Sequence, residues 1–132
     1  MSSAYSDPQT RIGLVLGEGT NAAYVENIKN VKKWKGPYPE SEKMIINTEW
    51  GSFDEGKKVL PINKFDEILD LKSRDPGKHI FEKMISAFYL GEIVRLTCLS
   101  LVKKKILFNG QSSPVFDKQN SFQIQFLSRI ER

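Results

Sequence analysis

Four polar residues occur where the sequence could build a binding site, because each ends or interrupts an apolar run. Asn21 follows the run GLVLGEGT, Glu49 closes the run KMIINTEW, and His79 and Glu82 lie near the start of a long apolar segment. Amide and carboxylate groups can hydrogen-bond to pairs of neighbouring hydroxyls, and the aromatic Trp50 beside Glu49 suits a sugar. The four residues are therefore candidates for a sugar site. From the residues alone, a turn role for Asn21 and solvent-facing helix positions for His79 and Glu82 stay open, and such roles are more common.

A second candidate is the glycine-rich segment Gly17-Glu18-Gly19-Thr20, which could form a turn that holds a phosphate or a sugar. It separates two extended runs, so the sequence predicts a β-hairpin with this turn at its tip. The first strand of the hairpin is expected to be buried, because four of the six residues in RIGLVL are apolar. A carboxylate between two glycines is unexpected in a turn that would face an anion.

The elements that must position these residues follow from periodicity, caps and turn residues. The predicted elements are, in order, strands at 11–16, 21–28 and 43–50, a short helix capped by Asn63 and a long helix from Lys78 to about Leu107, with loops at 32–43 and 109–121 and a helix or strand at 122–132. At about 1.5 Å per residue the long helix would extend on the order of 45 Å.

The predicted long helix needs more covering elements than the chain supplies. Gly91 lies within it and lowers its stability unless another segment packs closely there. Three strands and one large helix do not make a complete layered fold. We therefore expect a piece of a larger fold. If the piece is an incomplete gene model, Ile80, Phe88 and Leu96 would lack their normal cover and the expressed chain would aggregate.

Composition places the chain among ordinary globular proteins. Of its 132 residues, 39% are hydrophobic and 27% charged, and the net charge is +4. The basic clusters at 29–35 and 103–105 are expected to be solvated surface and not a nucleic-acid site. The single cysteine, Cys98, excludes an internal disulfide and favours a reducing compartment, and the single histidine, His79, excludes a Cys/His zinc cluster. With neither a signal sequence nor a membrane-spanning segment apparent, a cytoplasmic location is expected.

Three blocks of the sequence together resemble the hexokinase family: GLVLGEGTNAAY, IINTEWGSF and DPGKHIFEKMISAFYLGEIVRL. They occur in the family's order and spacing, and the opening SSAYSDPQ is also similar, so the resemblance runs from about Tyr5 to Ile130. It implies an α/β chain that is part of the large lobe of an actin-like (ribonuclease H-like) ATPase fold, with a β-hairpin, a further strand and a long helix. Residues 1–132 would then be part of a hexokinase large, C-terminal domain.

The same resemblance implies a function and assigns the candidate residues. Hexokinases transfer the γ-phosphoryl group of MgATP to the 6-hydroxyl of a hexose such as glucose, the first step of glycolysis. Asn21, Glu49 and Glu82 match positions that hydrogen-bond glucose in the family. His79 stands where the family usually has a glutamine, and an imidazole cannot reproduce the paired geometry of an amide. The resemblance implies no protein-bound metal.

The glycine-rich turn, Gly17 to Thr20, matches the family's second phosphate-binding loop, with one departure. Hexokinases normally carry a threonine where this chain has Glu18. Like charges a few ångström apart repel by about 1 kcal/mol in water and by several in a partly dry cleft. Glu18 thus predicts weakened ATP binding unless it turns away or a lysine such as Lys29 neutralises it. The alternative, of equal weight, is that Glu18 is a surface turn residue without a functional role.

Several parts of the family's machinery have no match here. The resemblance places the catalytic aspartate just upstream of this chain and the adenosine contacts downstream of Arg132, and Asp7 does not match the aspartate motif. Three interpretations follow: a segment of a hexokinase, a degenerate or truncated relative that binds a sugar or a protein without catalysis, or an incomplete gene model with no independent life. We favour the first and expect the isolated chain to have no kinase activity.

Overall fold

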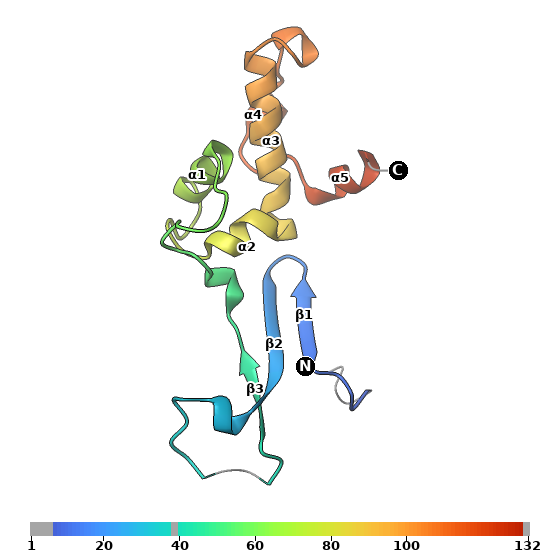
Figure 1. Ribbon diagram of the computed structural model, residues 1–132. Helices are drawn as coiled ribbons and strands as arrows, with labels where there is room; N and C mark the ends of the chain where they lie inside the picture. The colour runs from blue at the N-terminus through green and yellow to red at the C-terminus, as the bar shows by residue number, and fades with distance from the viewer. Residues whose placement is uncertain (1–6, 38–39, 131–132) are drawn as a thin grey trace.

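The structure is a computed structural model that describes residues 7–37 and 40–130. Tyr5 and most of the segment SSAYSDPQ lie outside the described residues, as do the last two residues of the chain. The α-helices gather beyond one end of a small sheet, and the turn between the first two strands points towards them (Figure 1).

The sheet has three antiparallel strands in the order β1-β2-β3. They are β1 (Ile12–Leu16), β2 (Thr20–Asn27) and β3 (Lys43–Asn47), and a short 3-10 helix, η2 (Ile28–Asn30), follows β2. The predicted hairpin is confirmed, with Leu14 opposite Ala22 in the register. The third strand ends at Asn47 and not at Trp50, because the chain turns there into a second 3-10 helix, η3 (Trp50–Ser52).

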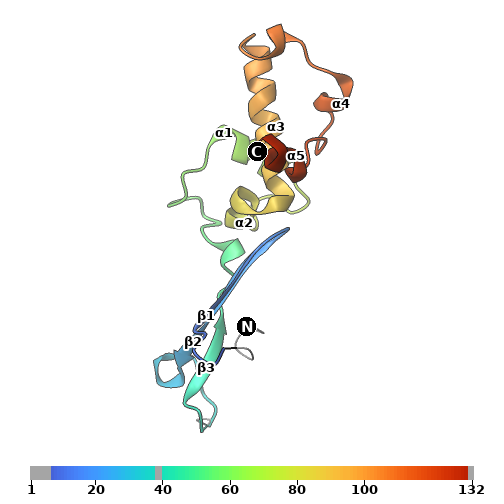
Figure 2. The same ribbon diagram turned by 90° about the vertical axis from the view of Figure 1, so that its right-hand side faces the viewer.

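The prediction that the first strand is buried is wrong. Its large apolar side chains are between 52% and 69% exposed. Seen from the side, the α-helices lie beyond one end of the sheet and cover neither of its faces (Figure 2). The strand therefore has the apolar composition of an interior strand without the layers that would bury it.

The first helix, α1 (Lys64–Leu71), begins as predicted at Asn63. The Asn63 side chain accepts hydrogen bonds from the N–H groups of Phe65 and Asp66, and the Asp66 carboxylate accepts one from the Asn63 N–H. This reciprocal capping box satisfies backbone donors that the helix itself cannot.

The prediction of one continuous helix from Lys78 to Leu107 is wrong. Two helices, α2 (Ile80–Ile85) and α3 (Ala87–Lys103), meet at Ser86, whose backbone is extended at φ −82° and ψ 149°. The Ala87 N–H donates to the carbonyl of Gly17 at 2.8 Å. The break thus places the start of α3 against the hairpin turn.

The C-terminal part contains more helix than predicted. After α3 come η4 (Phe108–Gly110), α4 (Pro114–Asp117) and α5 (Ile124–Ile130), so part of the predicted loop at 109–121 is helical and the terminal element is a helix. A Cβ added to Gly91 would lie 2.0 Å from the carbonyl oxygen of Phe122. Glycine in α3 is therefore required by the close approach of the segment leading into α5.

The buried apolar core is small, and buried polar groups accompany it. Its members are Ala22, Ile28, Leu69, Ile80 and Val102. Ile80 is thus covered, contrary to the prediction, whereas Phe88 is 68% exposed as expected and Leu96 is half-buried. Two buried ion pairs, Asp70–Lys83 and Glu92–Arg95, lie among the helices.

Candidate functional site

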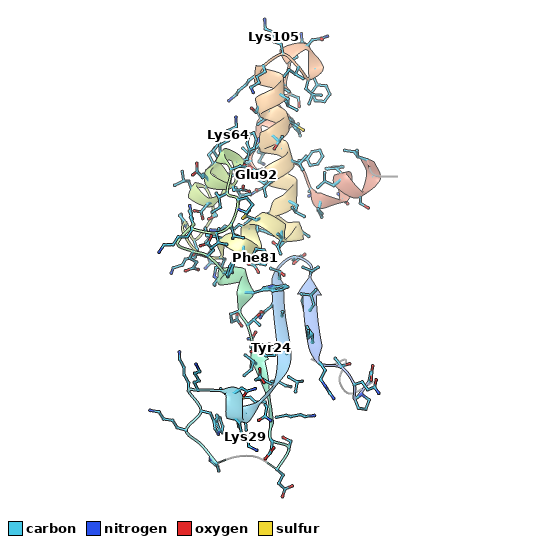
Figure 3. The ribbon with its side chains drawn as sticks, in the orientation of Figure 1. Tyr24, Lys29, Lys64, Phe81, Glu92 and Lys105 are labelled. Atoms are coloured by element: carbon cyan, nitrogen blue, oxygen red, sulfur yellow. The ribbon has the colours of Figure 1, made fainter. Side chains whose placement is uncertain are left out.

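The 3-10 helix η3 lies where the sheet meets the helices, and each of the four candidate residues is tied to it or to its flanking residue. Figure 3 labels Phe81 at this junction, where its ring packs edge-on against Trp50 with centroids 5.6 Å apart. The Trp50 indole N–H donates to the hydroxyl of Thr20 at 3.0 Å, which connects η3 to the base of the hairpin turn.

Asn21 and Glu49 are brought together on the edge of this junction. The Asn21 amide donates to the Glu49 carboxylate at 3.2 Å and to the side-chain oxygen of Asn47 at 2.9 Å. The Asn47 amide also donates to the Glu49 carboxylate. Glu49 has a left-handed backbone at φ 48°, which redirects the chain from β3 into η3. Two amides and one carboxylate thus form an exposed, mutually oriented polar cluster.

Glu82 approaches the same junction from α2. One oxygen of its carboxylate accepts a hydrogen bond from the Thr20 N–H at 3.0 Å. A Cβ added to Gly19 would lie 2.9 Å from that oxygen, and one added to Gly51 would lie 3.3 Å from the Glu82 Cβ. The two glycines therefore allow the hairpin turn and η3 to close around this carboxylate.

His79 lies at the start of α2 with a left-handed backbone at φ 53°. Its ring Nδ1 lies 3.2 Å from the Ser52 hydroxyl of η3. The Glu55 carboxylate accepts hydrogen bonds from the His79 N–H and from the Lys78 ammonium, both at 3.0 Å. The hydrogen bond from the His79 N–H, and to a smaller extent the one from Lys78, lowers the pKa of Glu55. The carboxylate therefore stays ionised and holds the left-handed backbone of His79 in place.

The glycine-rich segment 17–20 forms the tip of the hairpin, closed by a hydrogen bond from the Gly17 N–H to the Gly19 carbonyl at 2.9 Å. Thr20 is buried, and its hydroxyl donates to the Val15 carbonyl while it accepts from Trp50. The only proton of the Thr20 hydroxyl is thus already donated within the protein. A phosphate at this turn would have to bind backbone N–H groups and not that hydroxyl.

Glu18 is exposed and lines an open cavity of about 420 Å³ beside the start of α3. Glu92 also lines the cavity, but its carboxylate pairs with Arg95 at 2.6 Å. The lysine suggested as a neutralising partner, Lys29, lies at the other end of β2 and pairs with Glu42 at 2.8 Å (Figure 3). Lys29 therefore does not meet Glu18.

Other site types find no support within residues 7–37 and 40–130. This part of the chain contains no group of three or more His, Cys, Asp or Glu side chains placed to hold a metal ion. Its helices include none with the length and apolar character that crossing a membrane requires.

Three residues of the junction were not among the predicted site residues: Asn47, Ser52 and Glu55. Asn47 could have been found, because an amide two residues before Glu49 in the same strand end carries the same signal. Ser52 and Glu55 lie in a turn-rich segment without periodicity, so only the tertiary structure brings them to His79.

Comparisons with known proteins identify the family to which the chain is similar. The sequence profile of the family described as Hexokinase matches residues 11–132. Hexokinase-3 of Homo sapiens is 46% identical over 99% of this chain, and Hexokinase-2 of Saccharomyces cerevisiae is 39% identical over 99%. The chain spans 14% and 28%, respectively, of the length of these two relatives.

A solved structure of hexokinase from Schistosoma mansoni, described as complexed with glucose, superposes with a TM-score of 0.90 at 40% identity. The match covers 99% of this chain and 29% of that structure's chain. The hairpin, strand and helices described above are thus α/β elements of the actin-like ATPase fold that hexokinases share. The chain belongs to the hexokinase family.

Proposed function

We propose that this chain forms one wall of a glucose site, together with a phosphate-binding turn, in a protein that phosphorylates hexoses with MgATP. The observation that carries the proposal is the convergence of four residues from three segments on η3. Asn21 comes from β2, Glu49 from the end of β3, and His79 and Glu82 from α2. Residues 1–132 would then be part of the hexokinase large domain, and the rest of the hexokinase chain would be its partner.

Each of the four residues has a role that its chemistry allows. The carboxylates of Glu49 and Glu82 accept hydrogen bonds from sugar hydroxyls, and the Asn21 amide both donates and accepts. His79 offers one ring N–H in place of an amide's two donors. Since Glu82 already accepts from the Thr20 N–H, a sugar bound to Glu82 is also held close to the hairpin turn.

The phosphoryl donor is expected at the hairpin turn, which meets the start of α3. The Glu18 carboxylate at the tip of this turn repels a polyphosphate and so weakens ATP binding. In a full-length hexokinase that carries this segment, Glu18→Thr should lower the KM for ATP about tenfold without changing the KM for glucose. An unchanged KM for ATP would contradict the repulsion and favour a neutral turn residue.

Glucose binding can be measured directly on the 132-residue chain by tryptophan fluorescence. Trp34→Phe leaves Trp50 as the single tryptophan, and Trp50 adjoins Glu49. We expect a saturable fluorescence change with glucose, and at least a tenfold loss of affinity, about 1.4 kcal/mol, in Glu82→Gln. Glu67→Gln, on the exposed face of α1, is the control and should bind as the parent does. Equal affinity in Glu82→Gln and the parent would refute the assigned site.

The formation of glucose 6-phosphate distinguishes a catalytic hexokinase from a relative that only binds sugar. Phosphoryl transfer requires a residue that accepts the hydroxyl proton, and we propose that the isolated chain forms no glucose 6-phosphate. Product formed by the purified chain would contradict this. Saturable glucose binding without turnover by the polypeptide that cells make would instead favour a non-catalytic sugar-binding relative.

We place the protein in the cytoplasm, which fractionation of its own cells would test.

A further inference from the structure

A buried ion pair lies on the side of α2 that faces α1. The Lys83 ammonium contacts the Asp70 carboxylate at 2.7 Å, and the two side chains are only 4% and 6% exposed. The second oxygen of Asp70 accepts from the Lys57 ammonium at 2.9 Å. One carboxylate near the end of α1 therefore holds two cations from different segments.

The pair also holds the backbone of the loop before α2, and Asp70 binds a side chain from the segment after η3. The oxygen of Asp70 that contacts Lys83 accepts a hydrogen bond from the Gly77 N–H at 2.9 Å, and the Lys83 ammonium donates to the Asp75 carbonyl at 2.6 Å. These contacts fix the loop that leads into α2. Lys57 lies in the turn that follows η3, so the same carboxylate also fixes the segment after η3.

Lys83 and Glu82 are neighbours in α2 and make contacts with different elements. Lys83 reaches Asp70 of α1, whereas Glu82 reaches the Thr20 N–H at the hairpin turn. The helix has six residues, and the His79 side chain at its start makes no capping hydrogen bond. A helix this short has little stability of its own, so tertiary contacts decide its position.

We propose that Asp70 and Lys83 are positioning residues of the sugar site, whose ion pair sets α2 so that Glu82 and His79 face the hairpin turn and η3. The sugar part of this inference rests on the proposed function. Neither residue is expected to touch the sugar. The pair acts through the loop at 75–77 and through α2.

The energetics of buried ion pairs suggest how to separate positioning from folding. Removing one partner leaves a buried charge unpaired and destabilises the fold, whereas replacing both by apolar residues of similar size is often tolerated. Asp70→Leu combined with Lys83→Met should therefore keep the chain folded. It cannot reproduce the bonds to the Gly77 N–H and the Asp75 carbonyl, so α2 loses its fixed position.

The chain offers a matched control in its second buried pair, Glu92–Arg95, with side chains 4% and 3% exposed. Arg95 donates to the carbonyls of Phe116 and Asp117 and not to α2 or its loop. Glu92→Leu combined with Arg95→Met thus also removes a buried pair, but one without contact to the sugar site.

The experiment compares both double variants with the parent, using glucose titration scaled to the folded fraction and amide hydrogen exchange at Thr20. Thr20 is the informative amide because its N–H donates to Glu82. We expect the Asp70/Lys83 variant to lose at least tenfold in glucose affinity and in Thr20 protection, and the Glu92/Arg95 variant to stay within twofold of the parent. If the double variant does not fold, hydrogen exchange at Thr20 is measured instead in Lys83→Met and in the parent over a series of denaturant concentrations.

Unchanged Thr20 protection in the Asp70/Lys83 variant would overturn the positioning role, whatever glucose does. Lost protection with unchanged glucose affinity would overturn its link to the sugar site. A parent that does not bind glucose would contradict the proposed function, while Thr20 exchange would still decide whether the ion pair positions Glu82.

Discussion

The tip of the β-hairpin and the strand that leads into it have opposite surroundings. At the tip, Thr20 is 6% exposed and bonded through its N–H and its hydroxyl, and the Gly17 carbonyl accepts from the start of α3. Along β1, by contrast, Leu14 and Val15 point to opposite faces of the sheet and are 52% and 62% exposed. The comparison shows that the described helices cover the tip of the hairpin and leave the strand β1 uncovered.

The physical reason lies in which packing partners residues 7–37 and 40–130 supply. The tip is surrounded by η3, α2 and α3, all within this chain, whereas an apolar strand needs a layer on each face. The chain spans 14% to 28% of two of its relatives, and the matched part of the Schistosoma mansoni structure is 29% of that chain. Four predictions test the contrast between the helical half and the sheet.

The largest effect is expected from Gly91→Ala, which attacks the close packing of the helical half. The new Cβ would meet the Phe122 carbonyl oxygen at 2.0 Å, so the segment leading into α5 must move away. We expect a loss of about 4 kcal/mol in the free energy of unfolding, measured by urea denaturation. Gly17→Ala is the matched control, because nothing lies within 4 Å of its Cβ position, and it should stay within about 0.5 kcal/mol. Equal losses in both variants would contradict the packing argument.

The second effect contrasts a buried ion pair of the helical half with an exposed one at the far end of the sheet. Glu92→Gln leaves the buried Arg95 charge without its partner, and we expect a loss of about 3 kcal/mol in unfolding free energy. Glu42→Gln removes the exposed partner of Lys29 and should change it by less than about 0.5 kcal/mol. Similar values for both variants would remove the contrast between the two halves.

The third effect is a dependence of stability on acid pH. Burial by itself would raise the pKa of Asp70, but the hydrogen bonds from Lys83, Lys57 and Gly77 outweigh it and hold that pKa below its usual value. The unfolded chain, with an aspartate pKa of about 3.9, then binds more protons as the pH falls, so this stabilisation is complete above about pH 4 and is lost below it. In Asp70→Asn the unfolding free energy should fall less steeply below pH 4. An identical slope in both proteins would rule out this contribution.

The smallest effect on stability is expected on the uncovered strand. Val15→Thr should change the free energy of unfolding by less than about 0.5 kcal/mol, because this side chain is already exposed. It should nevertheless reduce self-association in sedimentation experiments, since exposed apolar edge strands pair between molecules. Ile80→Thr, at a buried position in α2, is the control and should cost about 2 kcal/mol. A large stability loss in Val15→Thr would mean that β1 is covered in solution.

Much of the local structure could be predicted because its causes are local. The hairpin follows from the glycine-rich turn between two extended runs, and the start of α1 from the Asn63 cap. The candidate residues Asn21, Glu49 and Glu82 were found from residue type and from resemblance, and their convergence on η3 adds the geometry.

The break at Ser86 could not be predicted, because the apolar periodicity of Phe81, Met84 and Phe88 continues through it without proline or glycine. At the break the Ala87 N–H donates to the Gly17 carbonyl, a partner that is distant in sequence. Residue types and local patterns were enough to predict the strands, the capped helix, the family and the candidate residues, because these depend on neighbouring residues and on side-chain chemistry. The direction of α2, the left-handed backbone of His79 and the ion pair behind Glu82 became visible only in the folded chain, because each depends on hydrogen bonds between segments far apart in the sequence.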